Sequence, residues 1–179
     1  MVTHVSSEAR GDERGALLSF VEAQRGAIRR SVLGLTEEQA ASRPSASELS
    51  VSGLVKHVAE TELNWLRMAQ QKPNERVRTQ ETWGDSFRLV DDETIPQLLA
   101  FWAEVAAETE EFIRSVPSLD GTFPLPEAPW FPKDGEVSYR WLMLHLIEET
   151  ARHAGHADIV RESLDGKTAF ELVDAERLM

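Results

Sequence analysis

Hydrophobic residues recur at helical spacing in four stretches of the chain, and polar segments separate these stretches. Apolar residues three and four positions apart predict one amphipathic helix in each stretch. The four predicted helices cover residues 17–35, 50–72, 95–116 and 138–164. No segment alternates apolar and polar residues for long enough to predict a sheet.

Turn-forming and capping residues mark the ends of these helices. Ser50 and Ser52 are both candidate N-caps of the second helix, which we expect to stop before Pro73. Pro117 ends the third helix, and Gly166 provides a good C-terminal stop for the fourth.

Four helices that each carry one apolar stripe predict an all-α fold, an antiparallel four-helix bundle with long inter-helix loops. The loops are about 15 to 20 residues long, which is above the usual range for a simple bundle. We expect residues 1–179 to form a single domain, with a core over about 12–166. We expect the tail 167–179 to add a short helix that docks on the bundle or on a second subunit.

The loop before the fourth predicted helix, "PSLDGTFPLPEAPWFPKDGEVS", contains five prolines and two adjacent aromatic residues, Trp130 and Phe131. Long loops in compact domains tend to be functional. The two aromatic side chains either form an apolar wall that binds substrate beside a site, or they close the end of the bundle. The sequence leaves both alternatives open.

Composition narrows the class of protein. Hydrophobic residues make up 41% and charged residues 28%, as in soluble globular proteins, and no apolar run approaches membrane-spanning length. The net charge of −12 argues against nucleic acid and anionic membranes as partners. The chain has no cysteine, so it has no thiol nucleophile of its own, and we expect a reducing, cytoplasmic location.

Titratable residues interrupt the apolar stripes of the second and fourth predicted helices. Glu149 and His153 are four positions apart, so they lie on one face of the fourth helix, and His57 falls on the buried side of the second. Two imidazoles and a carboxylate are typical donors for zinc or nickel. His145 and His156 follow the same stripe as Glu149.

The spacing alone leaves two alternatives to a metal site. A histidine on an apolar face is often a core residue with satisfied hydrogen bonds, and a glutamate four positions before a histidine is often a surface ion pair. The pattern does exclude two kinds of metal site. The chain has neither the His-Glu-x-x-His motif of zinc proteases nor the repeated Glu-x-x-His pair of di-iron bundles.

The segments "SGLVKHVAETELNWL" and "WLMLHLIEETARHAGHADIVRESLDG" resemble the DinB/YfiT-like superfamily of metal-dependent bundles. The likeness runs from the first helix to Gly166. It is strongest to the DUF664, or mini-circle protein, branch, and the string "EETARHAGHADIVRE" is its most specific part. Glu149 departs from the His-x-x-x-His version of the last helix and is similar to the arrangement in mycothiol-dependent maleylpyruvate isomerases.

The resemblance implies a divalent metal ion, zinc or nickel, bound by His57, Glu149 and His153. It implies that His156, where many relatives have glutamine, orients a ligand, with His145 as a second such candidate. It also implies a homodimer that uses a low-molecular-weight thiol, mycothiol or bacillithiol, for S-transfer or isomerisation of a small molecule. The alternatives are a non-catalytic, stress-associated metal-binding dimer and a metal-free interaction bundle.

Overall fold

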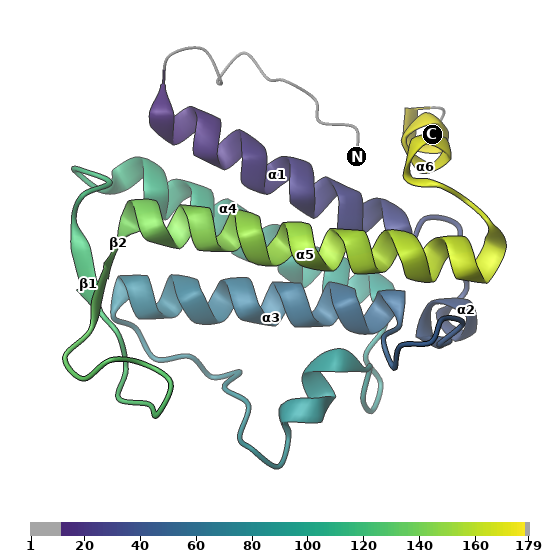
Figure 1. The fold of residues 1–179 in the computed structure, drawn as a ribbon, viewed down its shortest axis with the longest axis horizontal. Coiled ribbons are helices and arrows are strands. Elements are labelled where there is room, and N and C mark those ends of the chain that lie inside the picture. The colour runs from purple at the N-terminus through teal and green to yellow at the C-terminus, as the bar shows by residue number, and fades with distance from the viewer. Residues whose placement is uncertain (1–11, 178–179) are drawn as a thin grey trace.

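Four long helices form the body of the protein. The computed structural model describes residues 12–177. The long helices are α1 (Glu13–Ser31), α3 (Val51–Gln70), α4 (Ile95–Ser115) and α5 (Tyr139–Asp165), as Figure 1 shows. Each corresponds to one of the four predicted stretches, so the predicted all-α bundle is confirmed.

Capping side chains determine where α3 and α5 begin. Ser50, and not Ser52, is the N-cap of α3, because its hydroxyl accepts a hydrogen bond from the N–H of Gly53. Ser138 caps α5 in the same way. Gly166 ends α5 in the left-handed conformation, with φ of 75°, which glycine adopts without steric cost.

The helices do not simply alternate in direction. The α3–α4 contacts Glu62–Trp102 and Arg67–Glu108 join residues at a nearly constant sequence separation, so α3 and α4 run the same way. Residues 71–94 return the chain along the outside of the bundle and include the short 3₁₀ helix η2 (Trp83–Phe87), as Figure 1 shows. The length of this segment permits a return that a short loop would not. By contrast, α3 and α5 are antiparallel neighbours.

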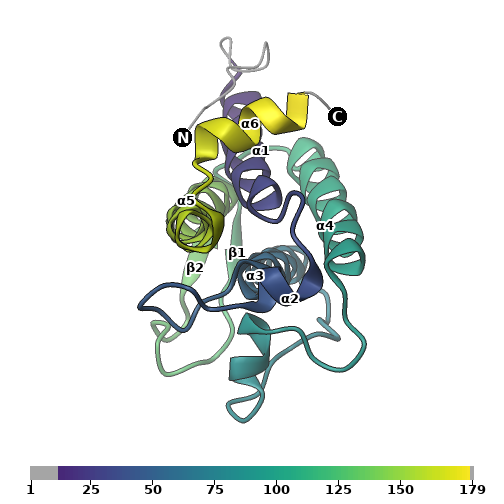
Figure 2. The ribbon, with the colours of Figure 1, turned by 90° about the vertical axis from the view of Figure 1, so that its right-hand side faces the viewer.

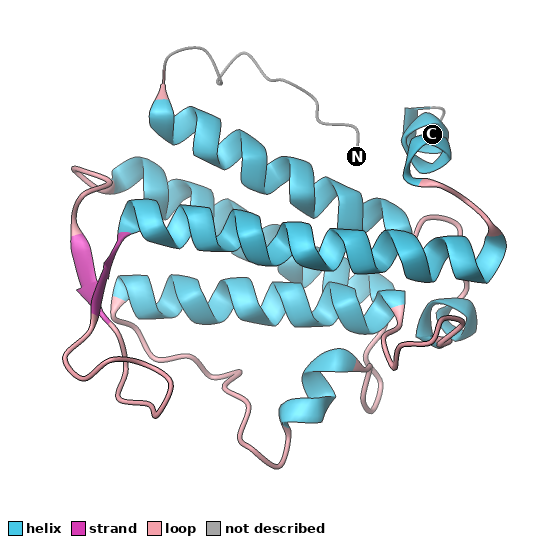
Figure 3. Ribbon diagram, in the orientation of Figure 1, coloured by secondary structure: helices cyan, strands magenta, loops and turns pink. Residues whose placement is uncertain are grey.

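The other two connections also contain small elements. The short helix α2 (Glu37–Ala41) lies between α1 and α3. Strands β1 (Thr122–Pro124) and β2 (Glu136–Ser138) pair antiparallel before α5, at the left-hand end of the bundle in Figure 3. The sequence did not predict this ribbon, because three-residue strands are too short for an alternating pattern to be recognised.

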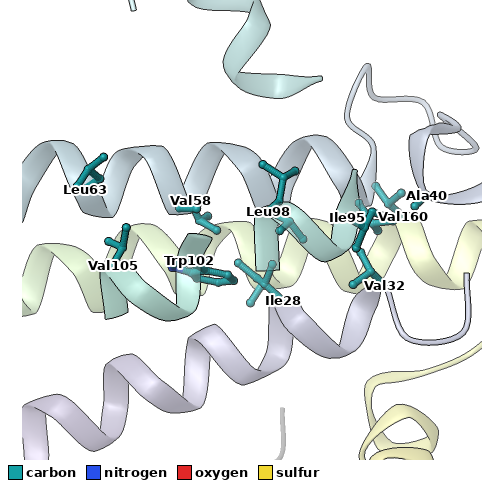
Figure 4. Close-up of a cluster of buried hydrophobic side chains, with 14 residues drawn as sticks. Ile28, Val32, Ala40, Val58, Leu63, Ile95, Leu98, Trp102, Val105 and Val160 are labelled. Carbon is teal, nitrogen blue, oxygen red and sulfur yellow. The ribbon is translucent and has the colours of Figure 1, made fainter. Parts of the chain in front are cut away.

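The core is divided between the two halves of the bundle. In one half Ile28 of α1, Val58 of α3 and Trp102 of α4 belong to the same buried cluster, which Figure 4 shows. A second cluster fills the half near the β ribbon and includes Trp65 and Phe123. The interface between α3 and α5 therefore has an apolar core behind it along its length.

The C-terminal segment forms α6 (Ala169–Arg177), which lies across the end of α1 in Figure 2. Leu172 is 2% exposed against the bundle, whereas Phe170 is 63% exposed. Arg30 of α1 forms an ion pair with Glu176 at 3.2 Å. Leu172 thus needs no second subunit to cover it. Within residues 12–177, no helix is both long and apolar enough to cross a membrane.

Candidate metal centre

His57 reaches the α3–α5 interface because of the apolar pattern of α3. Its neighbours Leu54 and Val58 are buried in the core, and the histidine itself is only 7% exposed. Its Nε2 lies 3.4 Å from Oε1 of Glu149 on α5. The imidazole therefore faces a carboxylate of the adjacent helix.

Glu149 and His153 occupy one face of α5, a helical turn apart, as their spacing predicted. His153 Nε2 lies 3.2 Å from the same Oε1 of Glu149. One nitrogen from each histidine and one carboxylate oxygen all lie within 4.8 Å of one another. The three residues predicted as metal ligands are therefore gathered at one point.

The charge state of this group suits a cation. Hydrogen bonds with His153 and then His57 hold the pKa of the Glu149 carboxyl well below its ordinary value of 4.5, although burial opposes them. The carboxylate is thus ionised at neutral pH, as a metal ligand must be. Within residues 12–177, the ion-pair contacts of Glu149 are with imidazoles and not with lysine or arginine.

His156 lies beside the group and contacts one of its members. Its Nδ1 is 3.4 Å from Nδ1 of His153, on the side of that ring away from Glu149. Burial, and then the charge of His153, lower the pKa of His156 from its ordinary value of 6.5. A neutral His156 can accept a hydrogen bond from Nδ1–H of His153, which would leave Nε2 of His153 free to bind an ion.

Phe87, to which no sequence pattern pointed, covers His57. The two rings are stacked, with centroids 4.0 Å apart and planes inclined by 19°. Phe87 ends η2, and its carbonyl oxygen lies so close to Gly53 that a Cβ there would be 2.0 Å from it. Only glycine at position 53 allows this backbone approach, one turn of α3 before His57.

Polar contacts with α3 hold the segment that carries Phe87. The buried Lys56 donates a hydrogen bond of 3.0 Å to the carbonyl of Arg88 and forms an ion pair with Glu93. Arg78 binds Glu60 through two hydrogen bonds, one of them 2.9 Å long. Residues 71–94 are therefore fixed to the helix that presents His57, on both sides of Phe87.

The remaining predicted residues lie further along the interface. His145 stacks on Trp141 at 4.9 Å and meets Trp65 edge-on at 4.6 Å, so the structure places it in an aromatic group. Phe131 is 6.1 Å from Trp65, whereas Trp130 is 78% exposed. A residue that closes the end of the bundle would be buried, so Trp130 does not have that role.

A sequence signal for Phe87 was hard to recognise. It lies in a long polar connection, thirty positions after His57, and nothing in its spacing relates it to either helix. Gly53 was the residue of the sequence that could have indicated a segment packed against this part of α3. A glycine within a helical pattern costs about 1 kcal/mol relative to alanine, so its presence indicates a packing reason.

The donor set formed by His57, Glu149 and His153 can bind one divalent ion and leave a coordination position open. Three protein ligands with an open position are typical of catalytic metal sites, whereas structural zinc sites normally have four. The 22% exposure of the Glu149 side chain gives the group contact with solvent.

Comparisons with known proteins agree with this fold. The family model for mycothiol-S-transferase matches residues 16–166. A solved crystal structure of a conserved protein from Enterococcus faecalis is similar with a TM-score of 0.62 and 16% identity, over 87% of this chain and 98% of that one. At this identity the likeness concerns the fold alone. A comparison with curated proteins found no match.

The matched residues include all three residues of the candidate metal centre and most of the bundle. The match also agrees with the resemblance to the DinB/YfiT-like superfamily. The chain belongs to the mycothiol-S-transferase family.

Proposed function

We propose that this protein is a divalent-metal-dependent enzyme that transfers a low-molecular-weight thiol, of the mycothiol or bacillithiol type, to a small molecule, or isomerises a small molecule with its help. The observation that carries this proposal is the convergence of His57, Glu149 and His153 at the α3–α5 interface. The family match supports the thiol chemistry.

The residues present fit a metal ion. Imidazole nitrogen and carboxylate oxygen together suit zinc or nickel, the two ions that we propose. Glu149 is partly withdrawn from water, and a bound cation would stabilise a carboxylate in such a position. The ionised Glu149 and the Nδ1 contact between His153 and His156 both prepare the site for such an ion.

Each protein group then has a role around the ion. When bound, the ion supplies a Lewis acid that lowers the pKa of a thiol reaching the site. His156 holds the proton on Nδ1 of His153, and Phe87 keeps water from one face of His57. The chain has no cysteine, so the sulfur nucleophile has to come from a co-substrate.

Trp130 and Phe131 remain our candidates for an apolar wall that contacts the substrate. The exposure of Trp130 and the contact of Phe131 with Trp65 at the α3–α5 interface support this assignment. We further propose a cytoplasmic homodimer that binds neither nucleic acid nor membranes, because the net charge is −12 and Phe170 is exposed on α6.

A thiol titration of the cobalt-substituted protein tests this function against a purely metal-binding role. We expect mycothiol or N-acetylcysteine to change the visible spectrum, because sulfur that joins cobalt produces a charge-transfer band. Glu149→Gln should lose both the metal and the response. The matched control Glu148→Gln changes an adjacent, exposed carboxylate and should keep both. A native spectrum that no thiol alters would overturn the thiol-transfer function.

A further inference from the structure

The aromatic group that contains His145 continues the α3–α5 interface beyond the candidate metal centre. We define this group as Trp65, Phe131, Trp141 and His145. The antiparallel register that sets His57 against Glu149 also sets Trp65 against Trp141, whose rings are 5.2 Å apart. The two groups thus follow one another along the same pair of helices.

The distance between the two groups is set by the helix. Trp141 precedes Glu149 by eight residues, which at about 1.5 Å per residue places it roughly 12 Å away along the α5 axis. His145 lies midway, one turn from each. On α3, Thr61 occupies the matching midpoint, four residues from both His57 and Trp65, and it is partly exposed. A hydroxyl and an imidazole therefore separate the metal ligands from the indole rings.

One side chain of the aromatic group is more exposed than is usual for aromatic side chains that pack together. Trp65 is buried, yet Trp141 remains 39% exposed although it stacks on His145. Exposed aromatic surface next to polar groups is typical of small-molecule sites, in which aromatic side chains supply area and a few polar groups give orientation. A group that only stabilised the bundle would gain free energy from burying Trp141 fully.

We propose that the aromatic group binds the sugar part of the thiol co-substrate while its sulfur lies at the metal centre, an inference that rests on the proposed function. Mycothiol joins its cysteinyl sulfur through an amide to a glucosamine ring, with an inositol beyond. A chain of this kind spans the separation between the two groups. The C–H face of a sugar ring stacks on an indole, and its hydroxyl groups hydrogen-bond to side chains such as Thr61 and His145.

The first test compares two thiols with the Trp141→Ala variant. Cobalt-substituted protein is titrated with mycothiol and with N-acetylcysteine, which lacks the sugars. We expect the change to raise the Kd for mycothiol about three- to tenfold and to alter that for N-acetylcysteine less than twofold. The control Phe170→Ala removes an exposed aromatic residue from α6 and should change neither constant. Equal weakening of both thiols, or no effect on mycothiol, would overturn the proposal.

A second measurement separates this proposal from the metal-dependent function. Saturation-transfer NMR on metal-free protein can detect glucosaminyl-inositol, the part of mycothiol without the cysteine. We expect signal transfer to the sugar protons in the native chain and its loss in Trp141→Ala. Binding of this probe without any thiol effect on the cobalt spectrum would refute the proposed function and keep the sugar site. The absence of binding would refute the sugar site, whatever the cobalt spectrum shows.

Discussion

Two glutamates, the buried Glu62 and the partly exposed Glu149, meet their partners in different ways. Glu62 lies in the bundle core, where it accepts hydrogen bonds from Arg25 Nε at 3.0 Å and from Trp102 Nε1 at 2.9 Å. Glu149 lies at the α3–α5 interface and faces Nε2 of His57 and His153. Each carboxylate therefore joins side chains from different helices.

The chemistry of the partners distinguishes a structural ion pair from a candidate ligand set. The guanidinium of Arg25 has a permanent charge, so the Glu62 pair is complete without any added ion. Imidazoles carry nitrogen lone pairs that a divalent ion can use, whereas a guanidinium has none to offer. Glu62 thus stabilises the fold, whereas Glu149 is available for binding.

Breaking the core pair should have the largest effect on stability. Glu62→Ala leaves Arg25 buried without its main carboxylate, and we expect a loss of about 3–5 kcal/mol in the free energy of unfolding, measured with urea. The metal content of the folded protein should stay unchanged. The double variant Arg25→Met with Glu62→Leu is the control, because an apolar pair should recover most of the loss. A loss below about 1 kcal/mol for Glu62→Ala would show that the pair contributes little.

Changing His156 should affect the binding site and leave the core intact. His156→Ala removes the acceptor for Nδ1–H of His153, and we expect metal affinity to fall about 10- to 100-fold, measured by competition with a chromophoric chelator. His156→Gln keeps a hydrogen-bonding group and should lose much less. Equal affinities for the native chain and His156→Ala would remove this histidine from the site.

The smallest effect is expected at the ring that covers His57. Phe87→Ala removes a stacking contact, so metal affinity should fall about three- to tenfold in the same chelator competition. Trp83→Ala is the matched control, since Trp83 lies in the same 3₁₀ helix and is 60% exposed. Similar losses in the two variants would mean that η2 acts only through its general packing.

The helices were predictable because each carries a long apolar stripe with clear end signals, such as Ser138 and Gly166 of α5. The relative directions of the helices could not be predicted in the same way. An apolar stripe shows which side of a helix is buried, but it does not show which neighbouring helix covers that side. The parallel course of α3 and α4 follows from the return of residues 71–94 along the bundle.

Helical periodicity alone was enough to predict that Glu149 lies close to His153. The contact of His57 with Glu149 depends in addition on how α3 packs against α5. Arg25 shows the limit of such reasoning. Arginine is mostly an exposed residue, yet the structure buries Arg25 against Glu62, and helical phase alone does not reveal a partner on another helix. Phe87 was missed for the same reason.

Metal analysis of the purified native chain and of His153→Ala tests the central claim most directly. After growth with zinc and nickel, we expect one divalent ion per native chain and no stoichiometric ion in the variant, with unchanged helical circular dichroism as evidence that the variant folds. Full occupancy in His153→Ala, or a native chain without metal, would contradict the assignment of His57, Glu149 and His153 as the metal centre.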